Sequence, residues 1–226
     1  MSNSSQIEVD FYFDFISPNA YLAWHALREL AASENILIKP HPVIFAALLY
    51  QFDQRGPAEI ASKALWMGLN VQRKARKMGL ALKPPASHPF NPLLSLRLVL
   101  SLDDDAQRLV LIDQLFSAIW AQGVAGDKPE ELIEWLNKVL PELKLSASAA
   151  QTPDVKARLR ASTDAAIKAG VFGVPTMVVD KMSFFGYDDM EFLHDYILGR
   201  DSITQEDIAA WQGTKPSAFR KDKTRT

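Results

Sequence analysis

Hydrophobic periodicity divides the chain into two strand-containing ends and a helical middle. Residues 7–15 form an apolar run in which Phe recurs at every second position from 11 to 15, and this period predicts a strand. Apolar residues at helical spacing follow over 21–30, and a second apolar run over 36–43 predicts another strand. Two strands joined by a helix pair in parallel by default, so we expect the chain to open with a β-α-β unit.

Residues 45 to 150 carry helical patterns with no clear strand, and strands return only near the end. Helices are predicted over 58–80, 93–102, 106–122 and 129–139, with a proline-rich loop over 83–92. The last part predicts a helix over 154–169 closed by Gly170, a hairpin of strands 176–179 and 183–185 around a turn at 180–181, and a helix over 188–198. Residues 212–226 read as a polar tail.

The junction between the first strand and the first helix carries the first chemical signal. Ser17 and Pro18 stand there, and a serine followed by proline is typical of a helix start, with serine as the cap. Unpaired backbone N–H groups and the positive end of the helix dipole gather at such a start, which suits an anion such as a thiolate. A plain helix cap is the alternative interpretation of Ser17.

A second signal lies far downstream, where Val174 and Pro175 lead directly into the strand at 176–179. A strand and helix early, with Val-Pro and a strand late, is the plan of a thioredoxin-like domain. The predicted fold class is therefore α/β, a thioredoxin-like domain with an inserted all-helical domain. The domains are 7–44 plus 152–200 for the discontinuous thioredoxin-like part, 45–151 for the helical insertion, and 201–226 for a partly flexible C-terminal extension.

Composition restricts the chemistry that this plan can perform. The 226 residues include no cysteine, which excludes disulfides, thiolate metal sites, a cysteine nucleophile and thiol–disulfide exchange by the chain's own side chains. Sulfur chemistry would need an external thiol, and glutathione is the obvious source. The four histidines show no metal-ligand spacing, and a net charge of −2 does not suggest nucleic acid. The absence of a signal-like start or a membrane-length apolar run leads us to expect a cytoplasmic protein.

Five short motifs, in this order, resemble the family of kappa-class glutathione transferases and 2-hydroxychromene-2-carboxylate isomerases. They are 11–18 (FYFDFISP), 56–60 (GPAEI) with Lys63, 89–92 (PFNP), 170–176 (GVFGVPT) and 184–188 (FFGYD). The resemblance covers about residues 7 to 200. It implies the disulfide-oxidoreductase-A-like thioredoxin fold, glutathione as the cofactor, and a homodimer.

The resemblance also implies roles for individual residues. Ser17 would take the place of the first cysteine of a C-x-x-C motif and donate its hydroxyl to the glutathione sulfur, which favours the thiolate. The Val174–Pro175 bond would be cis and would pair with the glutathione main chain, whereas a trans proline beginning an edge strand is the alternative. Lys63 would contact a ligand carboxylate, or remain a solvated surface charge.

The γ-glutamyl end of glutathione would be held by a segment that departs from the family pattern. This segment is Phe185, Gly186, Tyr187 and Asp188, where Asp188 would meet the ligand ammonium or merely cap the last helix. The family commonly has Asn or Ser before this Asp and Arg after it. This chain has Tyr187 and Asp189 instead, so the details of the contact are open.

The pocket for a second substrate is expected to be apolar. Asn91, Phe45, Trp66 and Trp120 are candidates for its walls, with an Asx turn as the alternative for Asn91 and core packing for the three aromatic residues. The isomerases use a lysine for their aromatic carboxylate in the region near Leu49, where this chain has only apolar residues.

Together these features predict a glutathione-dependent isomerase of the 2-hydroxychromene-2-carboxylate isomerase type, acting in aromatic compound catabolism. Ser17 would be the catalytic residue, and the substrate a small aromatic or unsaturated electrophile. A kappa-like glutathione transferase or peroxidase, and a non-catalytic glutathione-binding protein, are the alternatives. No metal, nucleic acid or membrane is expected as a partner.

Overall fold

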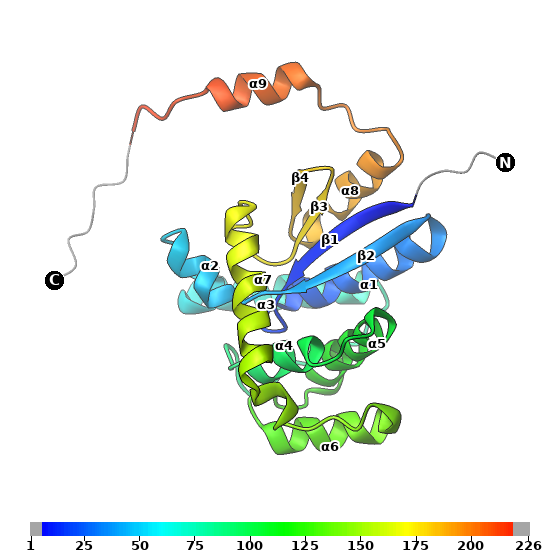
Figure 1. Ribbon diagram of the computed structural model, residues 1–226. Coiled ribbons are helices and arrows are strands. Elements are labelled where there is room, and N and C mark those ends of the chain that lie inside the picture. Colours follow the sequence, from blue (N-terminus) through cyan, green and yellow to red (C-terminus); the bar gives the residue numbers. More distant parts are fainter. Residues whose placement is uncertain (1–5, 219–226) are drawn as a thin grey trace.

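A computed structural model describes residues 6–218 and centres on a four-stranded mixed sheet (Figure 1). The strands are β1 (Ile7–Phe13), β2 (Ile36–Pro42), β3 (Thr176–Val179) and β4 (Met182–Phe185), in the spatial order β2-β1-β3-β4. β1 and β2 pair in parallel, whereas β3 is antiparallel to both β1 and β4. The predicted parallel β-α-β opening and the late hairpin are therefore confirmed.

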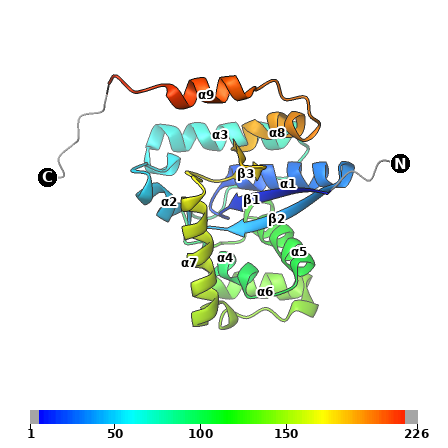
Figure 2. The same cartoon turned by 45° about the horizontal axis from the view of Figure 1, so that its top comes forward.

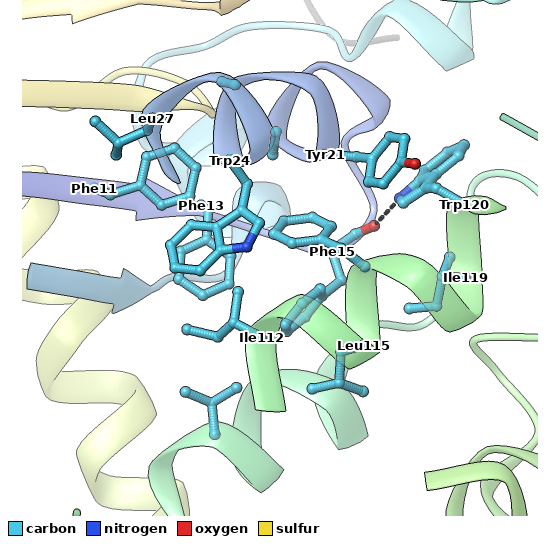
Figure 3. Close-up of a cluster of buried hydrophobic side chains, with 14 of the residues drawn as sticks. Phe11, Phe13, Phe15, Tyr21, Trp24, Leu27, Ile112, Leu115, Ile119 and Trp120 are labelled. Carbon is cyan, nitrogen blue, oxygen red and sulfur yellow. Dashed lines mark hydrogen bonds between the residues drawn. The ribbon is translucent and has the colours of Figure 1, made fainter. Parts of the chain in front are cut away.

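The first helix, α1 (Pro18–Ser33), covers the aromatic face of the sheet. The alternation in β1 places Phe11 and Phe13 on this face, where their rings stack with centroids 5.3 Å apart and Trp24 of α1 lies 5.4 Å from Phe11. Phe15 lies beyond the end of the strand, beside the other rings of this cluster (Figure 3), and its ring centroid is 4.7 Å from that of Phe116. All five side chains are buried, so one aromatic cluster joins the sheet, α1 and the helical middle.

The helical middle predicted for residues 45 to 150 is confirmed within the described residues. It contains α2 (Phe45–Gln51), α3 (Ala61–Lys77), α4 (Leu93–Leu100), α5 (Asp105–Phe116) and α6 (Pro129–Val139). In both views α4, α5 and α6 gather on the side of the sheet opposite α8 and α9 (Figures 1 and 2).

The chain returns to the sheet through α7 (Pro153–Lys168) and ends in α8 (Met190–Ile197) and α9 (Gln205–Gly213). Gly170 follows α7 with a φ of +81°, as expected for a glycine that closes a helix. The predicted turn between β3 and β4 is confirmed at Asp180 and Lys181, whose φ angles of 48° and 73° suit a tight hairpin.

Several boundaries differ from the sequence-based expectation. The predicted helix over 106–122 ends at Phe116 and continues as a π-helical turn, Ser117–Gln122, while the predicted 58–80 helix is the shorter α3. α9 was not predicted, because residues 201–213 carry too few apolar positions to show a helical period. The end of the polar tail, 219–226, lies outside the described residues.

Candidate functional site

Ser17 caps α1 and touches the backbone of Val174, so the two signals in the sequence meet at one point. Its Oγ accepts a hydrogen bond from the N–H of Ala20 at 3.2 Å and donates to the carbonyl oxygen of Val174 at 3.4 Å. The two residues are 157 positions apart in the chain, and Ser17 retains 9% exposure. The helix-cap role of Ser17 is thus real, and it coexists with a contact at the predicted ligand position.

The Val174–Pro175 bond is cis, as predicted. Its surroundings fix the backbone on both sides, because the Thr176 hydroxyl donates to the Gly173 carbonyl at 2.8 Å and the Gly186 N–H donates to the Pro175 carbonyl at 2.8 Å. The turn beside Ser17 is therefore held by β3 and by the segment that follows β4.

Asp14 is a site residue that the sequence analysis missed. Its carboxylate is 1% exposed and accepts N–H bonds from Ile16 at 3.1 Å and from Phe45 at 3.0 Å. Burial raises the pKa of the Asp14 carboxyl to about 7, although the two N–H bonds act in the opposite direction. The sequence did carry a signal for Asp14, because a carboxylate stands directly after an apolar run and three residues before the capping serine.

The helical insertion holds the loop between β1 and α1 from the opposite side. The indole Nε1 of Trp120 donates to the Phe15 carbonyl at 2.9 Å (Figure 3). Nε2 of His88 lies 2.9 Å from the Ile16 carbonyl. Burial lowers the pKa of His88, so the neutral ring donates through Nε2 to that carbonyl. Trp120 is 4% exposed, which fits the core-packing alternative, but its N–H makes it a support for the Ser17 loop.

Asp188 forms an ion pair with a lysine that the sequence analysis did not single out. Lys74 of α3 places its Nζ 2.7 Å from one carboxylate oxygen of Asp188 and 2.8 Å from the other. The same Nζ lies 5.5 Å from the ring centroid of Tyr187. The Asp188 side chain is 74% exposed, so this cation–anion pair lies at the surface.

The rest of the segment after β4 is shaped by contacts of its own. Gly186 has a φ of +81°, which permits the sharp turn into Tyr187. Asp189 accepts the N–H of Phe185 at 2.8 Å, so the residue that replaces the family's arginine has a structural role. Phe185 is 43% exposed and packs on Phe172 with centroids 4.8 Å apart.

The remaining predicted residues have mixed outcomes. Lys63 and Trp66 lie in the first half of α3 with exposed side chains, and Trp66 is 62% exposed, so core packing was the wrong alternative for this residue. Asn91 accepts the N–H of Leu93 at 3.1 Å, which is the Asx-type turn. Phe45 is half-buried against a small core cluster that includes Val174, and its N–H donates to Asp14.

Acidic and histidine side chains form no cluster of three or more suited to a metal ion among residues 6–218. Within the same part of the chain, every helix is too short or too polar to cross a membrane.

Several known proteins are similar to this chain. The model of the DSBA-like thioredoxin domain matches residues 8–198. The 2-hydroxychromene-2-carboxylate isomerase of Sphingobium xenophagum is 30% identical over 192 residues, which cover 84% of this chain and 97% of that protein. Glutathione S-transferase kappa 1 of Caenorhabditis elegans is 22% identical over 205 residues, covering 84% and 90%. A solved structure of 2-hydroxychromene-2-carboxylate isomerase is similar with a TM-score of 0.76 and 28% identity, over 86% of this chain and 95% of that one. These matches confirm the predicted fold class.

Proposed function

Because the chain belongs to the DSBA-like thioredoxin domain family and, within it, to the family of 2-hydroxychromene-2-carboxylate isomerases and kappa-class glutathione transferases, we propose that it is a glutathione-dependent isomerase. The proposed substrate is a small aromatic or unsaturated electrophile. We further propose that the protein acts in the cytoplasm as a homodimer. The domains are proposed as 7–44 with 152–200, 45–151 and 201–226.

The observation that carries the proposal is the place of the Ser17 hydroxyl in a chain without cysteine. It lies at the start of a sixteen-residue helix and beside the carbonyl of Val174. The 3.4 Å bond to that carbonyl is long, so the hydroxyl can turn toward a ligand sulfur at small cost. A hydroxyl donor and a helix N-terminus both favour a thiolate, and this supports a site for an external thiol.

Glutathione, when bound, supplies the thiolate that adds to an electrophilic carbon of the substrate and later leaves it. Ser17 holds the sulfur in its ionised form by donating a hydrogen bond. The backbone around Val174 and Pro175 pairs with the ligand main chain in the manner of an added strand. Phe45, Trp66 and Asn91 are the proposed walls for the substrate, and Lys63 is the proposed contact for a ligand carboxylate.

The γ-glutamyl end of glutathione carries both an ammonium and a carboxylate. The pair of Lys74 and Asp188 presents the two opposite charges side by side, at the segment Phe185–Asp188 that we propose to hold this end. Lys74 thus provides from α3 a cation in the region where relatives commonly carry an arginine. A zwitterion is matched by such a pair without leaving either charge alone.

The test is titration of glutathione by calorimetry, with the ultraviolet absorbance of the bound thiolate followed against pH. Wild type is compared with Ser17→Ala and with Thr152→Ala. Thr152 caps α7 through a bond from the Val155 N–H at 3.3 Å and is likewise followed by proline, so its variant controls for the loss of a cap alone.

We expect all three proteins to bind glutathione. In wild type and Thr152→Ala, the bound thiol should ionise near neutral pH. In Ser17→Ala it should ionise at a pH about one unit higher, which corresponds to about a tenfold loss of thiolate at a fixed pH below that value. Absence of glutathione binding by the wild type would contradict the proposal.

A glutathione transferase is the second candidate, and the apolar surface of α2 and α3 favours it. Tyr50 and Trp66 are 82% and 62% exposed, and α2 carries no cation to meet a substrate carboxylate. Release of a glutathione conjugate from an unsaturated electrophile would identify a transferase, whereas recovery of free glutathione with a rearranged substrate would identify an isomerase. Binding without turnover of either kind would leave a non-catalytic glutathione-binding protein.

A further inference from the structure

We propose that Asp14 is a positioning residue for Ser17, tying the loop before α1 to the first residue of α2 through its carboxylate. The inference rests on the proposed function, because it assigns the preparation of that same site to a residue that touches neither ligand nor substrate.

The tie consists of three N–H groups that converge on Asp14. One carboxylate oxygen accepts from Ile16 at 3.1 Å and the other from Phe45 at 3.0 Å. The backbone carbonyl of Asp14 accepts from the N–H of Ser17 itself at 3.1 Å. Ile16 donates to the carboxylate of Asp14, and Ser17 donates to its backbone carbonyl. Both residues are therefore held against Asp14, so the position of the Ser17 hydroxyl depends on where Asp14 lies.

The second end of the tie reaches the other half of the site. Phe45 is the first residue of α2, and the N–H of the preceding Ile44 donates to the Thr163 hydroxyl of α7 at 3.1 Å. Leu48 of α2 packs in the same small core cluster as Val174. The carboxylate therefore links the loop between β1 and α1 to α2, which packs with α7 in the same cluster as Val174. The carbonyl of Val174 is the partner of the Ser17 hydroxyl.

The surroundings of Asp14 hold no compensating cation among the contacts that the structure gives. α1 contributes the Ser17 hydroxyl, α7 contributes the Thr163 hydroxyl, and the 83–92 loop contributes His88, which burial keeps neutral. On the strands, Asp10 lies four residues before Asp14 and is paired with His41 of β2 at 2.7 Å. Burial raises the pKa of Asp14 to about 7.

The charge of Asp14 therefore changes near neutral pH, and the strength of the tie changes with it. Above pH 7 the carboxylate holds both N–H groups with charge-assisted bonds, which are about twice as strong as neutral ones. Below pH 7 the protonated carboxyl holds them less firmly. The Ser17 site should thus be best ordered when Asp14 is ionised.

Two measurements test this assignment. The first uses the wild type alone and follows the amide resonances and hydrogen exchange of Ile16 and Phe45 by nuclear magnetic resonance from pH 5.5 to 8.5. The second measures by calorimetry, over the same range, the affinity for S-methylglutathione, whose sulfur has no proton to lose. It compares wild type, Asp14→Asn and Asp10→Asn, a control with the same change four residues earlier, on β1.

We expect the amides of Ile16 and Phe45 to titrate together near pH 7 in the wild type. The affinity for S-methylglutathione should rise about tenfold through that pH in wild type and Asp10→Asn, and stay flat and low in Asp14→Asn. Amides that do not titrate, or an Asp14→Asn protein with the wild-type pH profile, would overturn the assignment. If the wild type binds neither glutathione nor S-methylglutathione, the proposed function fails, and the amide titration still decides whether the tie exists.

Discussion

At the scale of single residues, the site combines groups of two kinds. Ser17, Val174 and Pro175 could be predicted from the sequence, because a Ser-Pro helix start and a Val-Pro strand start are local patterns with local causes. The place of Asp14 directly after an apolar run is visible in the sequence, but its role is not, and nothing local marks Lys74. Asp14 acquires its importance from burial, and Lys74 from a contact with Asp188 across 114 positions, so both depend on the packed structure.

The ion pair of Lys74 and Asp188 leads to a prediction about ligand recognition. Lys74→Met should weaken glutathione binding about tenfold, or roughly 1.4 kcal/mol, because the γ-glutamyl carboxylate loses its cation. Cysteinylglycine, which lacks that group, should bind both proteins equally in calorimetry. Lys77→Met, an exposed change in the last turn of the same helix, is the control. The free energy of unfolding should change by less than about 1 kcal/mol, because the pair is exposed at Asp188. Equal loss of affinity for both ligands would refute a role in γ-glutamyl recognition.

At the scale of elements, the helical insertion supports the site through the loop between β1 and α1. In that loop, the Phe15 carbonyl accepts a hydrogen bond from Trp120 and the Ile16 carbonyl accepts one from His88. Tyr21 of α1 also donates its hydroxyl to the Ala81 carbonyl at 2.7 Å. Hydrophobic periodicity predicted the helices of the insertion. It could not predict these bonds, since each joins side chain to backbone across 60 or more positions.

Trp120→Phe tests this support, because it removes the N–H that meets the buried Phe15 carbonyl. The lost bond and the smaller ring should lower the free energy of unfolding by about 2 kcal/mol or more, measured by urea denaturation followed by circular dichroism. Trp211→Phe is the control, since this tryptophan is 79% exposed on α9 and its change should stay within about 0.5 kcal/mol. Equal stability of the two variants would mean that the indole N–H contributes nothing to holding the loop.

At the scale of the whole molecule, segments from distant parts of the sequence converge on one buried loop. Ser17 stands between β1 and α1, and Phe45 of α2 bonds to Asp14 in the same loop. Thr163 of α7 holds Ile44 just before α2, and the turn that leads into β3 brings Val174 to Ser17. This convergence places a carboxylate in the core, where ionisation is opposed by the loss of water. The molecule therefore gives up some stability to keep Asp14 at the site.

That cost should appear as a pH dependence of unfolding. The pKa of Asp14 is about 7 in the folded protein and 3.8 in its ordinary state, so between these values the folded chain holds a proton that the unfolded chain has released. The free energy of unfolding then falls as pH rises from about 4 to about 7, and levels off above 7. Across the window the Asp14 contribution falls by roughly 4 kcal/mol, since each pKa unit corresponds to about 1.36 kcal/mol.

The difference in the free energy of unfolding between wild type and Asp14→Asn isolates this term, because paired surface carboxylates such as Asp103 are common to both proteins. Urea denaturation at several pH values should show that the free energy of unfolding of the wild type falls relative to that of the variant as pH rises. A difference that stays constant between pH 4 and 7 would show that Asp14 ionises normally in the folded protein, and the pH-sensitive tie at Ser17 would then lose its basis.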